Sequence, residues 1–570
     1  MKKSAGLFAN SFFLSLLLFI VTRVLWGFYF EEYEALFDAF YSGKFSPGTP
    51  FYSWYYMGNI GISYLYAELY QLAGGIEWMS WILYFYMLIA CSLTLFLIKR
   101  LLQTRLSTFS ILILQIFVFA FVFSDNLIHF HYTRVSYFLC GSSLLALIFL
   151  FPDGSSVKRK PFIFFLLNGL FVLGTFTRLE PAMAVIGLLF VFGVYYCSGL
   201  IQLTRLFAFP ALVVALVLGG IIYDTHHTKD FYKQVEPDIE TQITVRENYV
   251  PLSAMKTQSD SLKYLAAINM IWGDPKIVTP SFMRSLLTKD SAFFRDKRQW
   301  ARVENSLHEL LVEYWYLAVF NILIAILFFI QSYSSVPQYS KLLFILFQLS
   351  IWVLFATQTY YVKINERSFF PLLGLFSFIN LMLVFMRLSQ SSAAMRVSVI
   401  LVCMFGLVFQ LRANTIENNI LCKEREDYRY NLNVLHNLTG DNIIALNSSS
   451  FGFFTISNEP FKPFDFSAFP KVYLNEVQVL STVHTYHEYL EKECSCNVDT
   501  LTNFYRFLQA SDKKVYFLSV EDHMDLTRKY LLGMHNYNLD LKEVKVPGFR
   551  PVYDHEKAYI IELKVYTFNK

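Results

Sequence analysis

Long apolar runs separated by short polar connections make up most of the first 411 residues. A helix needs roughly 17–25 residues to cross a bilayer, and most of these runs reach that length. We therefore predict about eleven transmembrane helices, at 7–30, 80–98, 107–124, 135–151, 161–176, 181–197, 203–223, 313–332, 341–360, 369–386 and 396–411. Segment 55–73 is aromatic and only partly apolar, so we expect it to lie on the membrane surface rather than cross it.

The pattern changes after residue 411. Segment 412–570 alternates strand-like runs, such as KKVYFLSV, with helix-like runs, such as LTNFYRFLQ. Such alternation predicts a small α/β domain. This tail contains no glycine-rich phosphate loop, nucleophile elbow or zinc signature. The chain thus divides into a membrane domain, 1–411, and a soluble domain, 412–570.

Composition agrees with a polytopic α-helical membrane protein. The 570 residues are 55% hydrophobic and 16% charged, whereas soluble domains carry about 25% charged residues. The net charge of +4 is spread over many loops, so nothing in it indicates a nucleic-acid partner. The first apolar segment starts with basic residues but has no cleavage site before Arg23, which favours a retained helix over a cleaved signal.

Basic residues predict the orientation of the chain in the membrane. If the amino terminus is cytoplasmic, the cytoplasmic connections hold Lys2, Lys3, Lys99, Arg100, Arg105, Lys158, Arg159, Lys160, Arg205, Lys341, Arg387 and Arg396. This is the positive-inside pattern. It places loops 31–79 and 224–312 and the 412–570 domain outside the cytoplasm. The uncleaved first helix and this charge pattern fit a bacterial plasma membrane at least as well as an endoplasmic reticulum.

Charged residues of both signs gather at the outer ends of the predicted helices. They are Glu31, Glu32, Glu34, Asp38, Asp125, His129, His131, Arg134, Arg178, Glu180, Lys363, Glu366 and Arg367. Short connections at 125–134, 177–180 and 361–368 confine most of them to membrane depth, where charges are costly. Carboxylates can take a proton from a hydroxyl, and arginine or lysine can hold a phosphate and stabilise it as a leaving group. The set therefore suits a lipid-linked anionic substrate.

Each of these groups also has a structural explanation. Stretch 31–38 could form an amphipathic interfacial helix, and Arg178 with Glu180 could be a local ion pair that closes a hairpin. His129 and His131 could be hydrogen-bonding groups rather than metal ligands, and the group after residue 361 could anchor a helix at the interface. Taken together, these explanations do not account for the presence of both signs of charge on the outer side alone.

The cysteines indicate structural or incidental roles. Those in apolar segments, where a buried free thiol is the default, are Cys91, Cys140, Cys197 and Cys403. Cys422, Cys494 and Cys496 lie in the polar tail. One of the last two could bridge to Cys422 in an oxidising compartment; metal binding is the weaker alternative, because no CxxC or CxxH partner accompanies them.

The opening outer stretch carries a family resemblance. An acidic pair follows the first apolar segment, and then come a Ser-Gly pair, a proline, an aromatic-rich segment and a Tyr-Leu-x-Ala helix. The residues concerned are Glu31, Glu32, Tyr33, Ser42, Gly43, Pro50, Tyr64, Leu65 and Ala67. This arrangement resembles the entrance of the GT-C superfamily of membrane glycosyltransferases, above all its protein O-mannosyltransferase and aminoarabinose-transferase branch. Arg367 to Pro371 is similar to a later family feature, and Asp125 stands where the family often has a second acid.

The resemblance implies transfer of a sugar from a polyprenyl-phosphate carrier to a glycan, lipid or protein acceptor on the outer face of the membrane. It implies that Glu31 or Glu32 is the general base and that Asp125 orients the acceptor or a divalent cation, the one cofactor left open. It further implies a donor-phosphate site formed by Arg134, Arg178, Lys363 and Arg367. Assisting roles would fall to His129, His131 and Glu180.

Two other functions stay open. The chain has Glu-Glu where the family has Asp-Glu and lacks its Lys-Pro-Pro entrance, and the tail from 412 resembles nothing in the family. A lipid-glycan flippase or transporter would place charges near the middle of the bilayer, whereas the charges here lie at one face. A membrane scaffold whose outer domain binds a partner is the third hypothesis.

Overall fold

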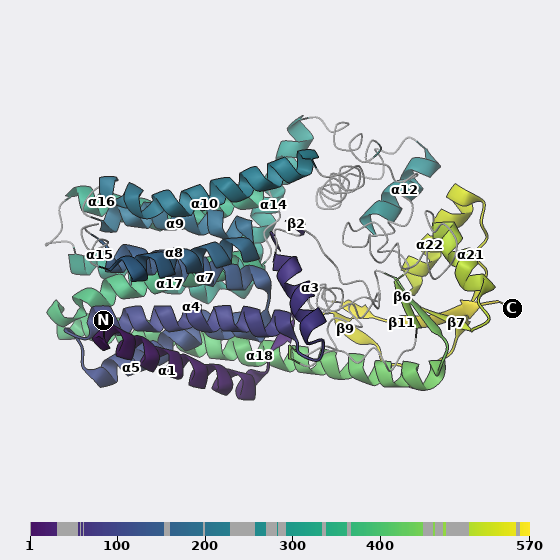
Figure 1. Cartoon of the computed structure of the whole chain (residues 1–570), viewed down its shortest axis with the longest axis horizontal. Coiled ribbons are helices and arrows are strands. Elements are labelled where there is room, and N and C mark those ends of the chain that lie inside the picture. Colours follow the sequence, from purple (N-terminus) through teal and green to yellow (C-terminus); the bar gives the residue numbers. More distant parts are fainter. Residues whose placement is uncertain are drawn as a thin grey trace.

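The computed structural model describes most of the chain: residues 2–30, 55–56, 59–60, 62–152, 160–197, 200–227, 257–269, 282, 292–332, 338–361, 366–447, 460–461, 471–474, 501–554 and 559–569. A long helical bundle forms one end of the molecule, and a small sheet with its helices forms the other (Figure 1). The amino terminus lies at the far end of the bundle, and the carboxy terminus lies beyond the sheet.

Every predicted apolar segment forms a helix. These helices are α1 (Lys2–Trp26), α4 (Trp78–Leu102), α5 (Thr108–Val118) with its continuation, α7 (Tyr132–Leu150), α8 (Pro161–Thr177), α9 (Leu179–Tyr196), α10 (Leu200–His227), α15 (Trp315–Ser332), α16 (Gln338–Tyr361), α17 (Glu366–Arg387) and α18 (Ala393–Thr439). Among the described residues, nine helices are long and apolar enough to cross a membrane, or ten if the bent pair at 303–331 is one span. Helix α8 is apolar but shorter, with 17 residues. The architecture is that of a polytopic helical membrane protein.

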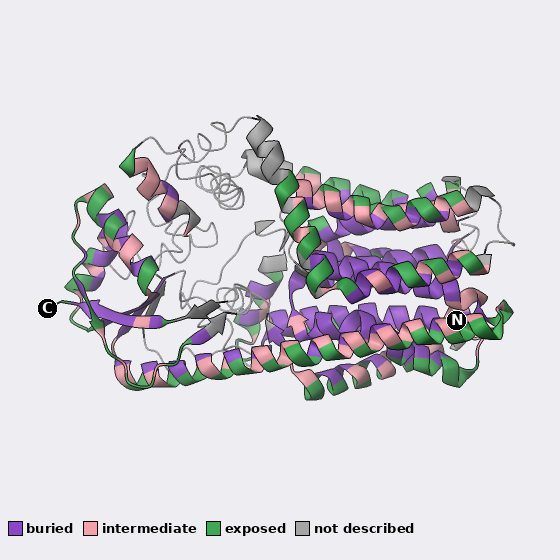
Figure 2. Cartoon of the chain, turned by 180° about the vertical axis from the view of Figure 1, so that it is seen from behind, coloured by how far each residue is buried: buried purple, intermediate pink, exposed green. Residues whose placement is uncertain are grey.

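Buried amide side chains join the helices within the bundle. Helices α4, α7 and α17 form its most buried part (Figure 2). The Asn321 amide donates to Ser377 Oγ at 2.8 Å and accepts from Asn380 Nδ2 at 3.1 Å. Gln348 in turn donates to Asn380 Oδ1 at 2.7 Å. Hydrogen bonds of this kind hold helices together where lipid supplies no hydrophobic driving force.

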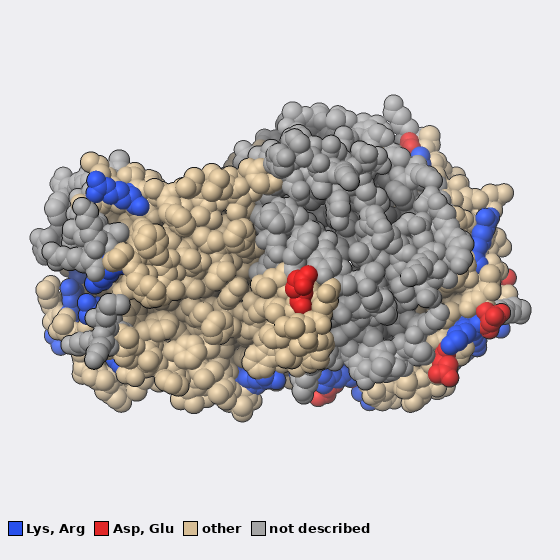
Figure 3. Space-filling view, viewed as in Figure 1, with Lys and Arg blue, Asp and Glu red and all other residues tan. Residues whose placement is uncertain are grey.

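Charge is segregated along the bundle. Figure 3 shows lysine and arginine gathered at the end where the amino terminus lies, and a largely uncharged flank. The described cations of this end include Lys99, Arg100, Arg105, Lys160 and Arg387. The opposite end carries the residues of the candidate site described below and faces the sheet.

A π-helix interrupts the helix that leads to the candidate site. Helix α5 continues into η1 (Phe119–Phe123), which is followed by α6 (Ser124–Ile128). A short strand, β4 (His129–Phe130), then leads into α7. Such π turns change the direction in which the following side chains point, and here they precede Asp125. Strand β1 (Tyr29–Phe30), at the end of α1, pairs in parallel with β4.

Segment 55–73 does not cross the bundle. It forms β2 (Tyr55–Tyr56), β3 (Asn59–Ile60) and α3 (Ile62–Leu72), and the 11 residues of α3 are too few to span a bilayer. Tyr66 and Tyr70 are buried against the bundle, while Leu65 and Leu72 are exposed. The expectation that this segment does not cross the membrane agrees with the short length of α3, while its position at the membrane surface stays a prediction.

The last bundle helix extends far past the predicted end of the membrane domain. Helix α18 runs without a break to Thr439, so the boundary predicted at 411 falls inside one helix. Hydropathy drops at that point, but no proline or glycine occurs between residue 412 and Gly440, and helical hydrogen bonding continues through the polar residues. Gly440, with a φ of 51°, follows the last helical residue.

The tail contains the predicted α/β structure. Its five-stranded sheet has the order β6 (Lys471–Leu474), β5 (Ile443–Leu446), β7 (Val515–Val520), β11 (Leu563–Phe568) and β8 (Leu541–Val544). Strand β5 is parallel to β6 and β7, whereas β11 is antiparallel to β7 and β8. The remaining described elements of the tail are α21 (Leu501–Ala510), α22 (Glu521–His535) and a hairpin of β9 (Val552–Asp554) and β10 (Tyr559–Ile561).

Two helices from loop 224–312 are described. Helix α12 (Gln258–Ile268) contacts α22, with Ser259 Oγ 3.5 Å from the Met534 sulfur. Helix α14 (Ala292–Glu313) leads into α15 through a sharp bend. From the sheet side, the Phe461 ring packs on Trp81 and Tyr84 of the bundle. The sheet-bearing part of the chain and the end of the bundle that faces it therefore share contacts.

Cys422, for which the sequence left a bridge to Cys494 or Cys496 open, contacts Tyr29 of β1. Cys422 is a free thiol whose sulfur lies 2.8 Å from the Tyr29 hydroxyl. Cys494 and Cys496 lie outside the described residues.

Close packing at Gly406 predicts a stability effect. A Cβ at this position of α18 would lie 2.8 Å from a Phe320 ring carbon and 3.0 Å from a Phe121 ring carbon. Overpacking of this kind costs about 1–3 kcal/mol, so Gly406→Ala should lower the thermal unfolding midpoint of the detergent-purified protein. Gly169→Ala in α8 is the control, because a Cβ there meets nothing within 4 Å. Equal midpoints for the two variants would contradict the packing described.

Candidate functional site

A buried ion pair lies at the end of the bundle that faces the sheet. Arg134 Nη1 donates to Asp125 Oδ2 at 2.9 Å and to Asn126 Oδ1 at 3.1 Å. The Arg134 and Asp125 side chains are 2% and 12% exposed. Both acceptors come from α6, and Arg134 comes from the first turn of α7. The helix–strand–helix turn between residues 124 and 134 thus folds back on itself through this pair.

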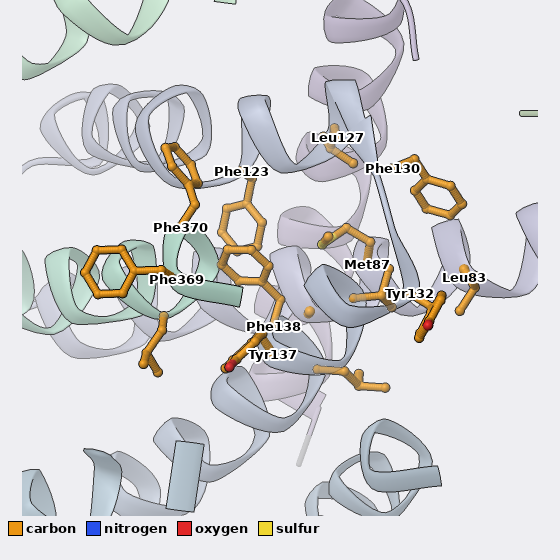
Figure 4. Close-up of a cluster of buried hydrophobic side chains, with 14 of the residues drawn as sticks. Leu83, Met87, Phe123, Leu127, Phe130, Tyr132, Tyr137, Phe138, Phe369 and Phe370 are labelled. Atoms are coloured by element: carbon orange, nitrogen blue, oxygen red, sulfur yellow. The ribbon is translucent and has the colours of Figure 1, made fainter. Parts of the chain in front are cut away.

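The elements that carry the pair also contribute to a cluster of buried hydrophobic side chains. Figure 4 shows this cluster, which includes Phe123, Leu127, Phe130, Phe138, Phe369 and Phe370. The Arg134 guanidinium lies 5.8 Å from the centre of the Phe370 ring, which belongs to α17. Electrostatic attraction is stronger in such a low-dielectric environment than at an exposed surface, and so is the penalty for an unpaired charge.

The two histidines of this turn differ in their surroundings. His129 Nε2 lies 4.0 Å from Asp125 Oδ1, one helical turn away in sequence. His131 Nδ1 accepts a hydrogen bond from the Thr133 amide at 2.9 Å and so caps α7. Its ring stacks on Tyr132, with 4.4 Å between ring centres. In this structure the hydrogen-bonding role of His131 is therefore the capping of a helix.

Arg178 lies on the other side of the α7 amino terminus. It is the residue between α8 and α9 and has an extended backbone. Its Nη1 donates to Thr133 Oγ1 at 2.8 Å and to the Tyr132 hydroxyl at 3.1 Å, and its Nε donates to Glu180 Oε2 at 3.2 Å. The Arg178 side chain is 22% exposed and that of Glu180 is 58% exposed. A ligand can therefore reach Arg178 far more easily than it can reach Arg134.

The structure brings together six of the predicted site residues. Four of them lie in the turn from α6 through β4 to the start of α7: Asp125, His129, His131 and Arg134. The other two, Arg178 and Glu180, lie at the α8–α9 turn, which contacts the start of α7. Arg367 lies in the first turn of α17, and Phe370, three residues on, contacts Arg134. The start of α17 therefore belongs to the same end of the bundle.

The remaining predicted site residues lie outside the described residues: Glu31, Glu32 and Lys363. The two further acids of the opening stretch, Glu34 and Asp38, lie outside them too. The chain that leads to the first of them is described. Strand β1 aligns Tyr29 with His129 and Phe30 with Phe130. The backbone one peptide bond before Glu31 is therefore fixed beside the Asp125–Arg134 turn.

Three polar side chains that the sequence analysis did not single out also contact the site. Asn414 Nδ2 donates to Ser124 Oγ at 2.7 Å, and Asn418 Oδ1 accepts from the Tyr29 hydroxyl at 2.9 Å. Gln410 donates to Asn414 at 2.8 Å. Their spacing of four residues along one helix was a readable signal, since such residues share a face.

No metal site is present in the described part of the chain. There, no group of three or more histidine, cysteine, aspartate or glutamate side chains is arranged to hold an ion. A divalent cation at this end of the bundle would need ligands in addition to the described ones.

A double-mutant cycle on the ion pair tests its role in the fold. Arg134→Met leaves the Asp125 carboxylate buried without its partner, which typically costs about 3–5 kcal/mol. Asp125→Leu combined with Arg134→Met removes both charges, so the double variant should unfold at a higher temperature than Arg134→Met alone. Thermal unfolding of the four proteins in the same detergent gives the coupling. Additive effects of the two substitutions would refute the pairing.

No protein-family model, no curated protein and no solved structure matches the chain. What the site does must therefore follow from its own chemistry.

Proposed function

We propose that the protein is a membrane glycosyltransferase of the GT-C type, which transfers a sugar from a polyprenyl-phosphate carrier to an acceptor on the outer face of the membrane. The pairing of β1 with β4 is the observation that carries the proposal. Because of this pairing, Phe30, the residue before Glu31, lies beside the Asp125–Arg134 turn. Carboxylates and guanidinium groups are the two kinds of group that the reaction needs, so in this proposal the acid pair and the arginines form one site.

The proposed reaction is a displacement at the anomeric carbon of the donor sugar. Glu31 or Glu32 takes the proton of the acceptor hydroxyl, whose oxygen then bonds to that carbon. The bond from the carbon to the phosphate oxygen breaks, and the polyprenyl phosphate leaves with the electron pair. A guanidinium that meets the phosphate stabilises the charge that develops on it.

The two described arginines suit different parts of this reaction. Arg134 is buried and bound to Asp125, so in this proposal the pair shapes the site and Asp125 orients the acceptor. Arg178 is more exposed, and two of its hydrogen bonds go to the neutral hydroxyls of Tyr132 and Thr133. We therefore assign contact with the donor phosphate first to Arg178, with Lys363 and Arg367 as its partners.

The transporter hypothesis gains less support from the bundle. Transporters tend to carry their substrate site near the middle of the membrane. Three amide side chains in the middle stretches of α15, α16 and α17 hydrogen-bond to one another, namely Asn321, Gln348 and Asn380. That arrangement suits helix association.

Substitution of the acid pair tests the proposed base. Glu31→Gln with Glu32→Gln should reduce transfer about 100-fold or more, because general bases contribute about 10²–10⁴-fold. The measurement is release of polyprenyl phosphate from polyprenyl-phosphate sugars by protein reconstituted in lipid vesicles. Glu34→Gln with Asp38→Asn is the matched control and should transfer at the wild-type rate. If the variant that lacks the acid pair transfers sugar at the wild-type rate, neither Glu31 nor Glu32 is the general base.

Arg178→Gln tests the phosphate contact. A hydrogen bond to a charged group contributes about 1.5–3 kcal/mol, so kcat/KM for the donor should fall about 10- to 100-fold. Arg396→Gln is the control, because Arg396 lies at the opposite end of the bundle, where it binds the Ser391 carbonyl. Equal losses in both variants would show that the effect is not local.

We also infer that the amino terminus is cytoplasmic and that the sheet lies outside. In a protein whose other cysteines are replaced by serine, a membrane-impermeant maleimide should label Cys422 in intact spheroplasts. An Ala5→Cys variant in a cysteine-free background should be labelled only after the membrane is permeabilised, since residue 5 is exposed at the other end of the bundle. The reverse pattern would invert the topology.

A further inference from the structure

Helix α18 contacts both chain segments that form the candidate site. Asn414 donates to Ser124, the residue before Asp125, at 2.7 Å. One helical turn later, Asn418 accepts from the hydroxyl of Tyr29, two residues before Glu31, at 2.9 Å. The two asparagines are four residues apart and therefore lie on one face of the helix.

The contact on the Ser124 side belongs to a buried chain of hydrogen bonds. Tyr316 of α15 donates to Gln410 Oε1 at 3.1 Å, and Gln410 donates to Asn414 Oδ1 at 2.8 Å. Gln410, Asn414 and Ser124 are all buried. Since a buried polar group left without its partner is costly, such a chain favours one arrangement of the three helices.

The contact on the Tyr29 side involves several groups of α18. The Tyr29 hydroxyl also lies 2.8 Å from Cys422 Sγ, and the Arg425 guanidinium lies 4.3 Å from the centre of the Tyr29 ring. Tyr29 is buried together with Leu421 and with Ile128 from the Asp125 turn. The last described residues before the acid pair are thus held between α18 and that turn.

The same helix then binds the sheet-bearing part of the molecule. The Asn431 side chain exchanges two hydrogen bonds with the Arg550 backbone, both at 2.9 Å. The Arg550 guanidinium stacks on Tyr430 at 3.8 Å and lies 3.3 Å from Asp427. Helix α18 has no break between Asn414 and Asn431.

We propose that Asn414 and Asn418 are positioning residues, which hold strand β1, the last described element before the acid pair, and the Asp125–Arg134 turn in a fixed register. Helix α18 thereby links the geometry of the site to the sheet-bearing tail. The catalytic consequence rests on the proposed glycosyl transfer, but the positioning itself can be measured without it.

Cys422 is a natural reporter of the Tyr29 contact. In a protein whose other cysteines are replaced by serine, Asn418→Leu and Tyr29→Phe each remove one side of the hydrogen bond. Both should raise the rate of Cys422 alkylation by a maleimide several-fold. Asn418→Asp keeps an acceptor oxygen and should restore the slow rate. Thr415→Val is the control, because the Thr415 hydroxyl bonds to Trp26 and to the Leu411 carbonyl on the exposed side of the helix, away from Tyr29.

The second measurement is donor cleavage by the same proteins, with polyprenyl-phosphate sugar in lipid vesicles as the probe. Asn414→Leu and Asn418→Leu should lower kcat about ten-fold and leave KM within about two-fold, since the loss of one hydrogen bond corresponds to about that factor. Asn418→Asp should recover kcat. Unchanged alkylation in Asn418→Leu and Tyr29→Phe, or faster alkylation with unchanged kcat, would overturn the inference.

The two proposals can fail separately. If the wild-type protein cleaves no polyprenyl-phosphate donor, the proposed function is wrong. The alkylation rates alone then test the positioning of Tyr29 by α18. Fast alkylation in Tyr29→Phe with slow alkylation in Asn418→Asp would still support positioning by α18, and equal rates in the two would overturn it.

Discussion

The buried ion pair between Asp125 and Arg134 is the constraint on which the outer end of the bundle depends. Removing two charges from water costs several kcal/mol for each ion, and that cost is offset only if the geometry of the pair is maintained. The π-helix before Ser124 directs Asp125, strand β4 sets the start of α7, and Phe370 of α17 covers the guanidinium. Three separate elements therefore meet at one hydrogen-bonded contact of 2.9 Å.

The sequence was sufficient to predict where the helices and the charged turns lie. Apolar runs long enough to cross a bilayer can hardly form anything but helices, and the short turns at 125–134 and 177–180 follow from them. The pairing inside those turns could not be predicted. Arg134 follows Asp125 by nine positions, and strand β4 lies between them. No local pattern says whether an arginine at membrane depth binds a neighbouring acid or a ligand.

In the tail, too, local features of the sequence were predictable, and contacts between distant residues were not. Alternating strand-like and helix-like runs predicted the sheet, because that signal is local. The strand order was not predictable, since β5 pairs with β7 from Ile443 to Val515, across a long stretch of chain. The predicted end of the membrane domain, at 411, was wrong as a structural boundary for a related reason. Hydropathy marks where a helix leaves lipid, but backbone hydrogen bonds decide where it ends, and α18 ends only at Thr439.

The side chains of Arg134 and Arg178 differ in their exposed fractions. This difference allows one site to be rigid and still accessible to a ligand. Arg134 is 2% exposed and neutralised by Asp125, so it fixes the turn from which α7 begins. Arg178 contacts that same turn through Tyr132 and Thr133, yet it remains 22% exposed. A guanidinium held by a rigid neighbour loses less conformational freedom when it meets an anion than a free surface side chain does. In the proposed function, the buried pair would therefore contribute to donor binding indirectly, by fixing the turn that Arg178 contacts.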